Sequence, residues 1–295
     1  MTDLHASPFT CALDARASLG ESPVWCAAEQ VLYWVDINAP ALNRFDPATG
    51  QNVVMPMPES IGCFALRTGG GFIVALRSGV WVASVRGVLE RKIAGAPYDP
   101  ARHRFNDGRC DRQGRFFPGS MNERRDAASG GLYRLNEDGT LLEVFGGVTI
   151  SNGLAWSPDG KTMYHADTPA HIVRVFDYDV STATPTNPRI FAPWIGENDR
   201  PDGAAVDSDG NYWIAFYGGA KIVQISPRGD LVAEYPVPAM CPTMCAFGGP
   251  DLRTLYVTSA RQKREADELA RLPQSGGLFS MRVDAPGLAE PHYRA

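Results

Sequence analysis

The stretch Gly20-Glu21-Ser22-Pro23-Val24-Trp25 places a carboxylate between a glycine and a Ser-Pro turn signal, directly before an apolar run. Three later stretches carry a short oxygen-bearing side chain in the same setting: 105–108 (FNDG), 151–154 (SNGL) and 201–204 (PDGA). Asn-Gly and Asp-Gly are common turn pairs, so one such stretch alone indicates only a turn. Four in the same local setting indicate a repeated structural unit.

Short runs rich in Val, Ile, Tyr, Phe and Trp, bounded by Gly, Pro or Asp, recur along the whole chain and predict β-strands. Examples are 31–36 (VLYWVD), 72–76 (FIVAL) and 211–215 (NYWIA). The runs form units that repeat at intervals of about 40 to 50 residues, which is typical of propeller blades. The equivalent points of the six units are Glu21, Gly62, Asn106, Asn152, Asp202 and Thr243. We therefore predict an all-β fold, a six-bladed β-propeller with four-stranded blades, as a single domain over residues 1–295.

Two segments lie outside the repeated pattern. Residues 9–13 (FTCAL) alternate in character and precede the first unit. Because an open ring would leave strand edges unpaired, we expect them to form the outer strand of the last blade. Residues 263–272 predict a helix inserted in a loop of the sixth unit and ended by Pro273. It would serve as a surface cap, or as a lid or oligomer contact.

The bulk composition excludes several classes of partner. A net charge of −5 without a basic run makes nucleic acid and anionic membrane surfaces poor candidates as partners. No apolar stretch reaches the ~18 residues of a membrane span, and the N-terminus lacks the features of a secretory signal. We expect a cytoplasmic protein, a monomer or weak homo-oligomer, whose six scattered cysteines are reduced and bind no zinc.

The predicted fold brings distant polar residues together. The innermost strand of each blade lines the central channel, so equivalent positions of different blades converge near the axis. Glu21, Asn152 and Asp202 are predicted to meet there and to hold one divalent metal ion. Carboxylate and amide oxygens suit Ca²⁺ best, with Mg²⁺ and Mn²⁺ also fitting and Zn²⁺ or Fe(II) left open. Three protein ligands leave positions for water and substrate, as a catalytic metal site requires.

Together the motifs resemble those of the senescence-marker-protein/gluconolactonase/regucalcin-like family of six-bladed propellers. The resemblance runs over nearly the whole chain. Its motifs are 20–25 (GESPVW), 104–108 (RFNDG), 151–153 (SNG) with 157–160 (SPDG), 201–203 (PDG) and 247–251 (FGGPD).

The resemblance implies the roles of individual residues. Glu21, Asn152 and Asp202 would hold the metal, and Asp202 would also act as the general base. Arg104 and Asn106 would contact the substrate, and Glu123, in a variable loop after Met121, is a further expected substrate contact. The implied reaction is metal-dependent hydrolysis of a sugar (aldono)lactone to the aldonic acid. Gluconolactone and a pentonolactone (arabino- or xylonolactone) both fit.

Two other functions remain open on the same scaffold. A calcium-dependent phosphotriesterase would hold its metal with more ligands and would lack the Arg-Phe-Asn pattern at 104–106. A non-enzymatic calcium-binding propeller would need more than three protein ligands for tight storage. A serine hydrolase is disfavoured because the chain has no Gly-x-Ser-x-Gly elbow.

Overall fold

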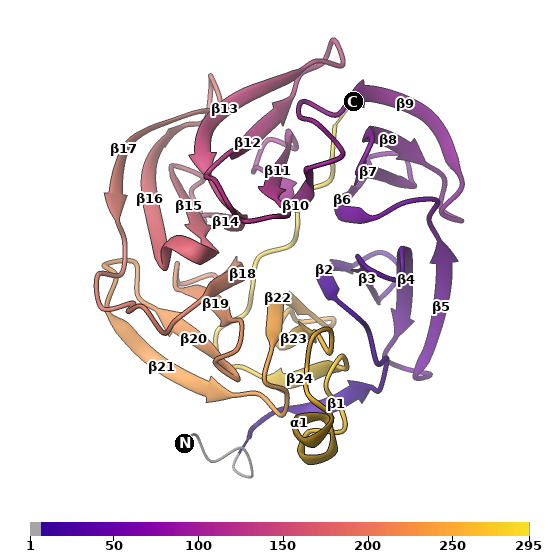
Figure 1. Cartoon of the computed structure of the whole chain (residues 1–295), viewed down its shortest axis with the longest axis vertical. Coiled ribbons are helices and arrows are strands. Elements are labelled where there is room, and N and C mark those ends of the chain that lie inside the picture. Colours follow the sequence, from indigo (N-terminus) through magenta and orange to yellow (C-terminus); the bar gives the residue numbers. More distant parts are fainter. Residues whose placement is uncertain (1–6, 295) are drawn as a thin grey trace.

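A computed structural model describes residues 7–294 of the chain. Six four-stranded antiparallel sheets surround a central channel, as Figure 1 shows. From the channel outward, the first three blades are β2 (Gly20–Cys26), β3 (Val31–Asp36), β4 (Ala41–Asp46) and β5 (Gln51–Pro56); β6 (Ile61–Leu66), β7 (Phe72–Leu76), β8 (Gly79–Ala83) and β9 (Leu89–Gly95); and β10 (His103–Cys110), β11 (Phe116–Asn122), β12 (Gly130–Leu135) and β13 (Leu141–Val148).

The other three blades repeat the same order. They are β14 (Ser151–Trp156), β15 (Thr162–Asp167), β16 (Ile172–Asp179) and β17 (Thr184–Ile190); β18 (Pro201–Val206), β19 (Tyr212–Phe216), β20 (Lys221–Ile225) and β21 (Leu231–Pro236); and β22 (Pro242–Gly248), β23 (Thr254–Ser259) and β24 (Leu278–Arg282), with β1 (Thr10–Leu13) outermost. The predicted six-bladed all-β propeller is confirmed.

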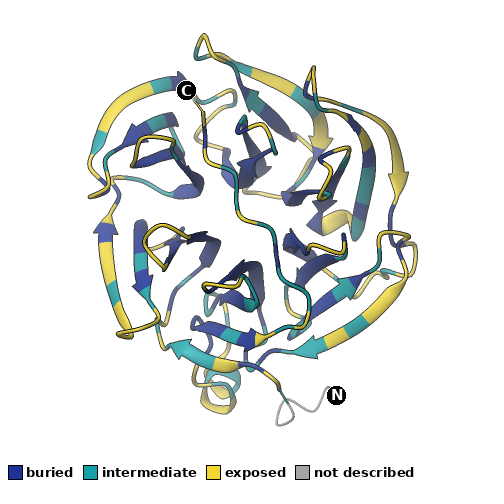
Figure 2. Ribbon diagram, turned by 180° about the vertical axis from the view of Figure 1, so that it is seen from behind, coloured by how far each residue is buried: buried dark blue, intermediate teal, exposed yellow. Residues whose placement is uncertain are grey.

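Burial follows the position of each strand in its blade. The inner and second strands are buried on both faces because neighbouring blades pack against them. Accordingly β7 is a continuous apolar run, and β3 is apolar up to its last residue, Asp36. The outer strand β17 is almost wholly exposed, and Figure 2 shows the same gradient around the ring. Aromatic side chains fill the gaps between blades: Trp25 stacks on Tyr256 with ring centroids 5.9 Å apart.

The ring is closed by its N-terminal strand. β1 pairs antiparallel with β24, with Thr10 opposite Ser280, so the predicted closing strand is confirmed. Phe9, directly before β1, is buried in the apolar cluster between the fifth and sixth blades. Pairing covers the edge of β24 that would otherwise be open to other chains.

The inner strands share an irregularity that turns their first residues toward the channel. In the first blade Glu21 pairs with Val35 but Val24 pairs with Tyr33, so β2 holds one extra residue. The inner strands of the other five blades slip against their neighbours at the equivalent place. Such β-bulges redirect side chains and are frequent beside functional sites.

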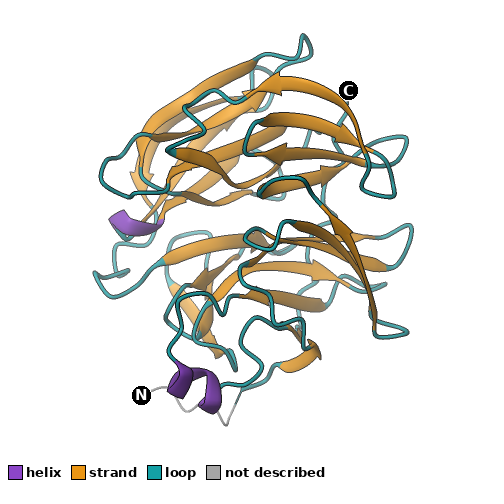
Figure 3. Cartoon of the chain, turned by 45° about the vertical axis from the view of Figure 1, so that its right-hand side comes forward, coloured by secondary structure: helices purple, strands orange, loops and turns teal. Residues whose placement is uncertain are grey.

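Two short helices lie on one face of the ring, as Figure 3 shows. The 3₁₀ helix η2 (Thr168–Ala170) follows β15, and α1 (Ala266–Arg271) lies between β23 and β24. The helix predicted over 263–272 therefore forms in the sixth blade, with tighter bounds. Over residues 7–294, no helix has the length and apolar character needed to cross a membrane.

The C-terminal segment crosses the opposite face of the ring, as Figure 2 shows. Backbone hydrogen bonds attach it to three blades: Gly287 N donates to Leu252 O at 2.8 Å, Ser208 N to Pro286 O at 2.8 Å, and Tyr293 N to Leu66 O at 2.7 Å. This segment covers the far end of the channel, so the end where the inner strands begin is the one open to ligands.

Candidate functional site

A cavity of about 310 Å³ lies at the end of the channel where the inner strands begin. Its size is at the low end of the range of about 300–1,000 Å³ for small-molecule sites. Five residues predicted from the sequence line it together: Glu21, Arg104, Asn106, Asn152 and Asp202. They come from β2, β10, β14 and β18, whose first residues converge as the propeller prediction requires.

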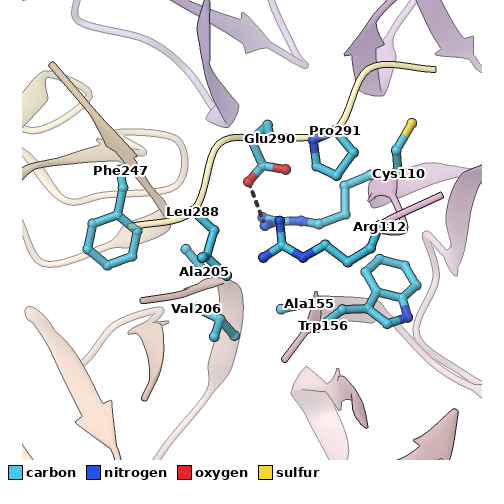
Figure 4. Close-up of a pocket in the computed structure, with 11 residues that line it drawn as sticks. Cys110, Arg112, Ala155, Trp156, Ala205, Val206, Phe247, Leu288, Glu290 and Pro291 are labelled. Carbon is cyan, nitrogen blue, oxygen red and sulfur yellow. Dashed lines mark hydrogen bonds and ion pairs between the residues drawn. The ribbon is translucent and has the colours of Figure 1, made fainter. Parts of the chain in front are cut away.

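Two other hollows formed by residues 7–294 lack this convergence of polar groups. At the far end of the channel a space of about 20 Å³ is lined by Arg109 and Glu290, which form an ion pair. Figure 4 shows this space with Glu290 and Pro291 of the C-terminal segment beside it. That volume admits about one water molecule. A surface hollow of about 580 Å³ beside Tyr164 is lined by none of the buried carboxylates. The cavity around Glu21 and Asp202 is therefore the candidate site.

Glu21 and Asp202 form a pair of buried carboxylates without a cationic partner in contact. Their exposed fractions are 7% and 5%. Burial raises the pKa of both, with the like charge of Asp107 adding to the rise for Glu21 and that of Glu21 adding to it for Asp202. Neither carboxylate accepts a hydrogen bond from any side chain of residues 7–294. Buried carboxylates in proteins are protonated, paired with a cationic group or bound to a metal, so these two residues could hold a cation.

Asn152 lines the same cavity as the two carboxylates, and hydrogen bonds hold both the nitrogen and the oxygen of its side-chain amide. Its Nδ2 donates to Thr168 Oγ1 at 2.7 Å, and that hydroxyl donates to Pro201 O at 2.7 Å. Asn106 Nδ2 donates to Asn152 Oδ1 at 2.7 Å, which uses one of the two lone pairs on that oxygen. The second lone pair remains available to a metal or ligand.

The donor set fits a hard divalent cation. Two carboxylates and one amide oxygen are the ligand types that Ca²⁺, Mg²⁺ and Mn²⁺ prefer. In the described part of the chain, no group of three or more His, Cys, Asp or Glu side chains is arranged to hold a metal. That finding is compatible with this site, because one of its three ligands is an asparagine.

Arg104 and Asn106 form a buried bonded unit beside the carboxylates. Arg104 Nη1 donates to Asn106 Oδ1 at 2.7 Å and to Phe105 O at 2.8 Å. Asn106 Nδ2 also donates to Ser151 O at 3.0 Å, so both amide hydrogens are used within the protein. Burial lowers the pKa of the Arg104 guanidinium, and the charge of Glu123 opposes that change.

Glu123, the remaining predicted substrate contact, lies behind Arg104. Arg77 donates to both of its oxygens, at 2.7 and 2.9 Å, and Arg104 Nε lies 3.7 Å from its Oε1. It is not among the residues that line the cavity. Its position suits holding the Arg104 side chain in place.

The cavity has further lining residues that the sequence pattern did not single out. Arg125, His171, Arg200 and Tyr217 reach it from loops and from η2. Arg200 stands directly before the 201–203 motif, Arg125 lies in the variable loop after Met121, and Tyr217 follows the strand run 211–215, which are the sequence signals for these three residues. His165, by contrast, is fully buried away from the cavity with Nε2 2.8 Å from Ser151 Oγ.

All six cysteines are free thiols, and five of them are buried. Burial raises the pKa of the Cys63 and Cys110 thiols well above its ordinary value. Neither lines the Glu21 cavity. A thiol nucleophile therefore has no part in the site.

Comparison with known proteins identifies the same family as the sequence motifs, over most of the chain. Residues 19–261 match the profile of the SMP-30/Gluconolactonase/LRE-like region. A 6-deoxy-6-sulfogluconolactonase from Pseudomonas putida is 46% identical over 281 residues, covering 95% of this chain and 97% of the relative. Regucalcin from Gallus gallus is 36% identical over 277 residues, covering 92% and 93% of the two chains.

A solved structure agrees over nearly the full length. The calcium-binding protein regucalcin from Agrobacterium tumefaciens superposes with a TM-score of 0.93 and 29% identity, covering 98% of this chain and 99% of that one. The six-bladed ring, the converging site residues and these similarities lead to one conclusion: the chain belongs to the SMP-30/gluconolactonase/LRE-like family.

Proposed function

We propose that the chain hydrolyses a sugar (aldono)lactone to the aldonic acid with the help of one divalent metal ion held by Glu21, Asn152 and Asp202. The observation that carries the proposal is the pair of buried carboxylates facing the same cavity as an oriented amide oxygen. Ca²⁺ is the favoured ion by ligand type. The solved relative described as calcium-binding supports the same choice.

The chain is a lactonase by family and by its 46% identity to a 6-deoxy-6-sulfogluconolactonase. The metal, the residue roles and the lactone are the proposed parts. The relative acts on a six-carbon lactone according to its name, which favours a hexonolactone over a pentonolactone.

The reaction adds water across the acyl C–O bond of the lactone ring. The ring oxygen becomes a hydroxyl of the same molecule, so no separate group leaves. A bound divalent cation would polarise the carbonyl as a Lewis acid. Asp202, which lines the cavity, takes the proton of the attacking water as general base.

Arg104 and Asn106 would orient the substrate and stabilise developing charge. Arg104 presents a buried guanidinium to the cavity, where it can donate to the oxyanion of the tetrahedral transition state. Asn106 has used both amide hydrogens, but its Oδ1 retains a lone pair that can accept from a sugar hydroxyl. Glu123 would act through Arg104 by holding its side chain.

The variants Asp202→Asn and Glu21→Gln test the proposal. Each should lower kcat/KM for gluconolactone at least about 100-fold, because Asp202 is the proposed general base and Glu21 a proposed ligand of the metal. The enzyme is stripped with EDTA, reconstituted with Ca²⁺, Mg²⁺, Mn²⁺, Fe(II) or Zn²⁺, and assayed with a pH indicator on hexono- and pentonolactones. Asp159→Asn, an exposed turn carboxylate, is the matched control and should leave the rate unchanged.

Near wild-type rates in Asp202→Asn or Glu21→Gln, with an unchanged circular dichroism spectrum, would refute the site assignment. Full activity of the stripped wild-type enzyme would refute metal dependence while leaving lactone hydrolysis intact. Tight Ca²⁺ uptake without turnover of any lactone would favour the non-enzymatic alternative, and turnover of organophosphates alone would favour the phosphotriesterase.

A further inference from the structure

Two arginines that line the cavity have no part in the proposed hydrolysis. Arg125 comes from the loop between β11 and β12, and Arg200 directly precedes β18. Among residues 7–294, neither side chain has a hydrogen-bond or ion-pair partner. We propose that Arg125 and Arg200 bind an anionic sulfonate or phosphate group on the carbon of the lactone farthest from the reacting carbonyl, which makes acidic aldonolactones the preferred substrates. This inference rests on the proposed lactonase function.

The loop that carries Arg125 is built to hold a fixed shape. Asn122 is fully buried at the end of β11, and its Nδ2 donates to Asp126 Oδ1 at 2.7 Å and to Ala127 O at 3.0 Å. Arg125 itself has a φ of 56° and donates its backbone N–H to Asn122 O at 3.1 Å. A non-glycine residue in the left-handed region costs energy and persists where surrounding contacts impose it. The loop therefore presents Arg125 from a defined position.

Arg200 is also held through its backbone, from a second loop. Tyr217 N donates to Arg200 O at 2.9 Å, and the following residue, Pro201, begins β18. His171 at the end of η2 bonds through Nδ1 to Asp199 O, which ties this loop to the wall of the cavity. The Arg200 side chain is left free to meet a ligand.

The charges of the cavity favour an anion. Its lining contains three arginines, Arg104, Arg125 and Arg200, and three carboxylates, Glu21, Glu197 and Asp202. A divalent cation bound between Glu21 and Asp202 would give the cavity a positive excess, although the chain as a whole has a net charge of −5. Arg104 is assigned to the reacting carbonyl, so Arg125 and Arg200 are the two lining arginines left for another group of the substrate.

Guanidinium groups suit the binding of a sulfonate or phosphate because two of their coplanar N–H donors can bond two oxygens of the anion at once. The anionic group would remain unchanged while water adds across the acyl C–O bond. The name of the relative that is 46% identical indicates a sulfonate on its substrate, which agrees with the arginines that line this cavity.

The experiment compares three lactones in the metal-reconstituted, full-length enzyme: gluconolactone, 6-deoxy-6-sulfogluconolactone and 6-phosphogluconolactone. The readout is the ratio of kcat/KM for each acidic lactone to that for gluconolactone. We expect a ratio above 10 for the wild type with at least one acidic lactone. Arg125→Gln and Arg200→Gln should each lower that ratio about 10-fold, mainly through KM, as loss of a charge-assisted hydrogen bond does.

Arg124→Gln is the matched control, since Arg124 lies in the same loop but does not line the cavity; its ratio should equal that of the wild type. Glu197→Gln removes the negative charge at the mouth and should raise the ratio. Which acidic lactone responds distinguishes a sulfonate from a phosphate substrate.

A wild-type ratio near 1, or equal losses on charged and neutral lactones in the arginine variants, would overturn the anion site while leaving the lactonase function in place. If the wild type hydrolyses none of the three lactones with any metal, the proposed function itself fails. The two failures are therefore distinguishable in one set of measurements.

Discussion

Glu21 and Asp202 occupy buried positions that are unfavourable for a charged carboxylate. Each carboxylate is buried, each has a raised pKa, and each lies in the field of other acids in the channel. In the free protein they oppose one another, and a cation between them would relieve that repulsion. Burying both carboxylates therefore costs free energy in the free chain, and a bound cation would offset that cost.

Stability of the stripped protein should fall as the pH rises. The pKa of Glu21 is raised from 4.5 to about 8, so the folded chain keeps a proton that the unfolded chain has lost between these values. The unfolded state then binds fewer protons, and the free energy of unfolding decreases with pH across that window. We expect Glu21→Gln to raise the Tm of the stripped protein at pH 8 by several degrees. At pH 4.5 the difference should shrink.

Metal addition supplies the complementary measurement. Ca²⁺ should raise the Tm of the wild type at pH 8, because a ligand that binds only the folded state stabilises it. It should have little effect on Glu21→Gln. An unchanged Tm in the wild type, measured by scanning calorimetry with excess Ca²⁺, would argue against a cation site between these carboxylates.

At the scale of elements, the C-terminal segment acts as a cover for the far end of the channel. Arg109 on β10 donates through Nη1 to Glu290 Oε1 at 3.0 Å, and Nη2 donates to Ala204 O on β18. The two side chains are 9% and 18% exposed. One ion pair thus joins the crossing segment to the inner strands of two blades.

Breaking this pair should be costly because the remaining charge stays buried. Glu290→Leu should lower the free energy of unfolding by about 3 kcal/mol, the lower end for loss of one partner in a buried pair. A double-mutant cycle with Arg109→Met, measured by urea unfolding, should give a large coupling energy. The exposed pair Arg189–Asp177, with exposed fractions of 49% and 55%, is the matched comparison and should couple by less than about 1 kcal/mol. Equal couplings would contradict the role of the segment as a cover.

At the scale of the whole molecule, closure of the ring makes every blade depend on its neighbours. The first and sixth blades pack through Trp25 and Tyr256, and β1 completes the sixth blade from the other end of the chain. Each blade needs a neighbouring blade on either side to cover its two faces. We propose on these grounds that residues 1–295 form one domain.

A single domain should unfold in one transition. Tryptophan fluorescence reports on Trp25, Trp156 and Trp213 in three different blades, whereas far-UV circular dichroism reports on all strands. We expect the two signals to give coincident urea midpoints. A variant lacking residues 1–13 exposes the edge of β24 and should unfold at lower urea and aggregate. Two separate transitions in the wild type would contradict the proposal.

The repeated motif by itself determined the number of blades and the meeting of Glu21, Asn152 and Asp202, and the alternation of residues 9–13 indicated the closing strand. This was possible because equivalent positions of a repeat must converge in a closed ring, so register along the sequence becomes proximity in space. Arg104 and Asn106 followed from the same register and from the family motif.

Only the tertiary structure decided what surrounds that motif. Arg125 and Arg200 reach the cavity from loops whose paths depend on distant contacts, such as the bonds of Asn122 and Tyr217, and no periodic pattern marks them. The same holds for the C-terminal segment, which has no strand pattern and is placed by bonds to three blades. A repeated unit has the same local geometry in each copy, so its pattern can be recognised in the sequence. Each loop has its own path, which depends on the particular neighbours that the closed ring brings to it.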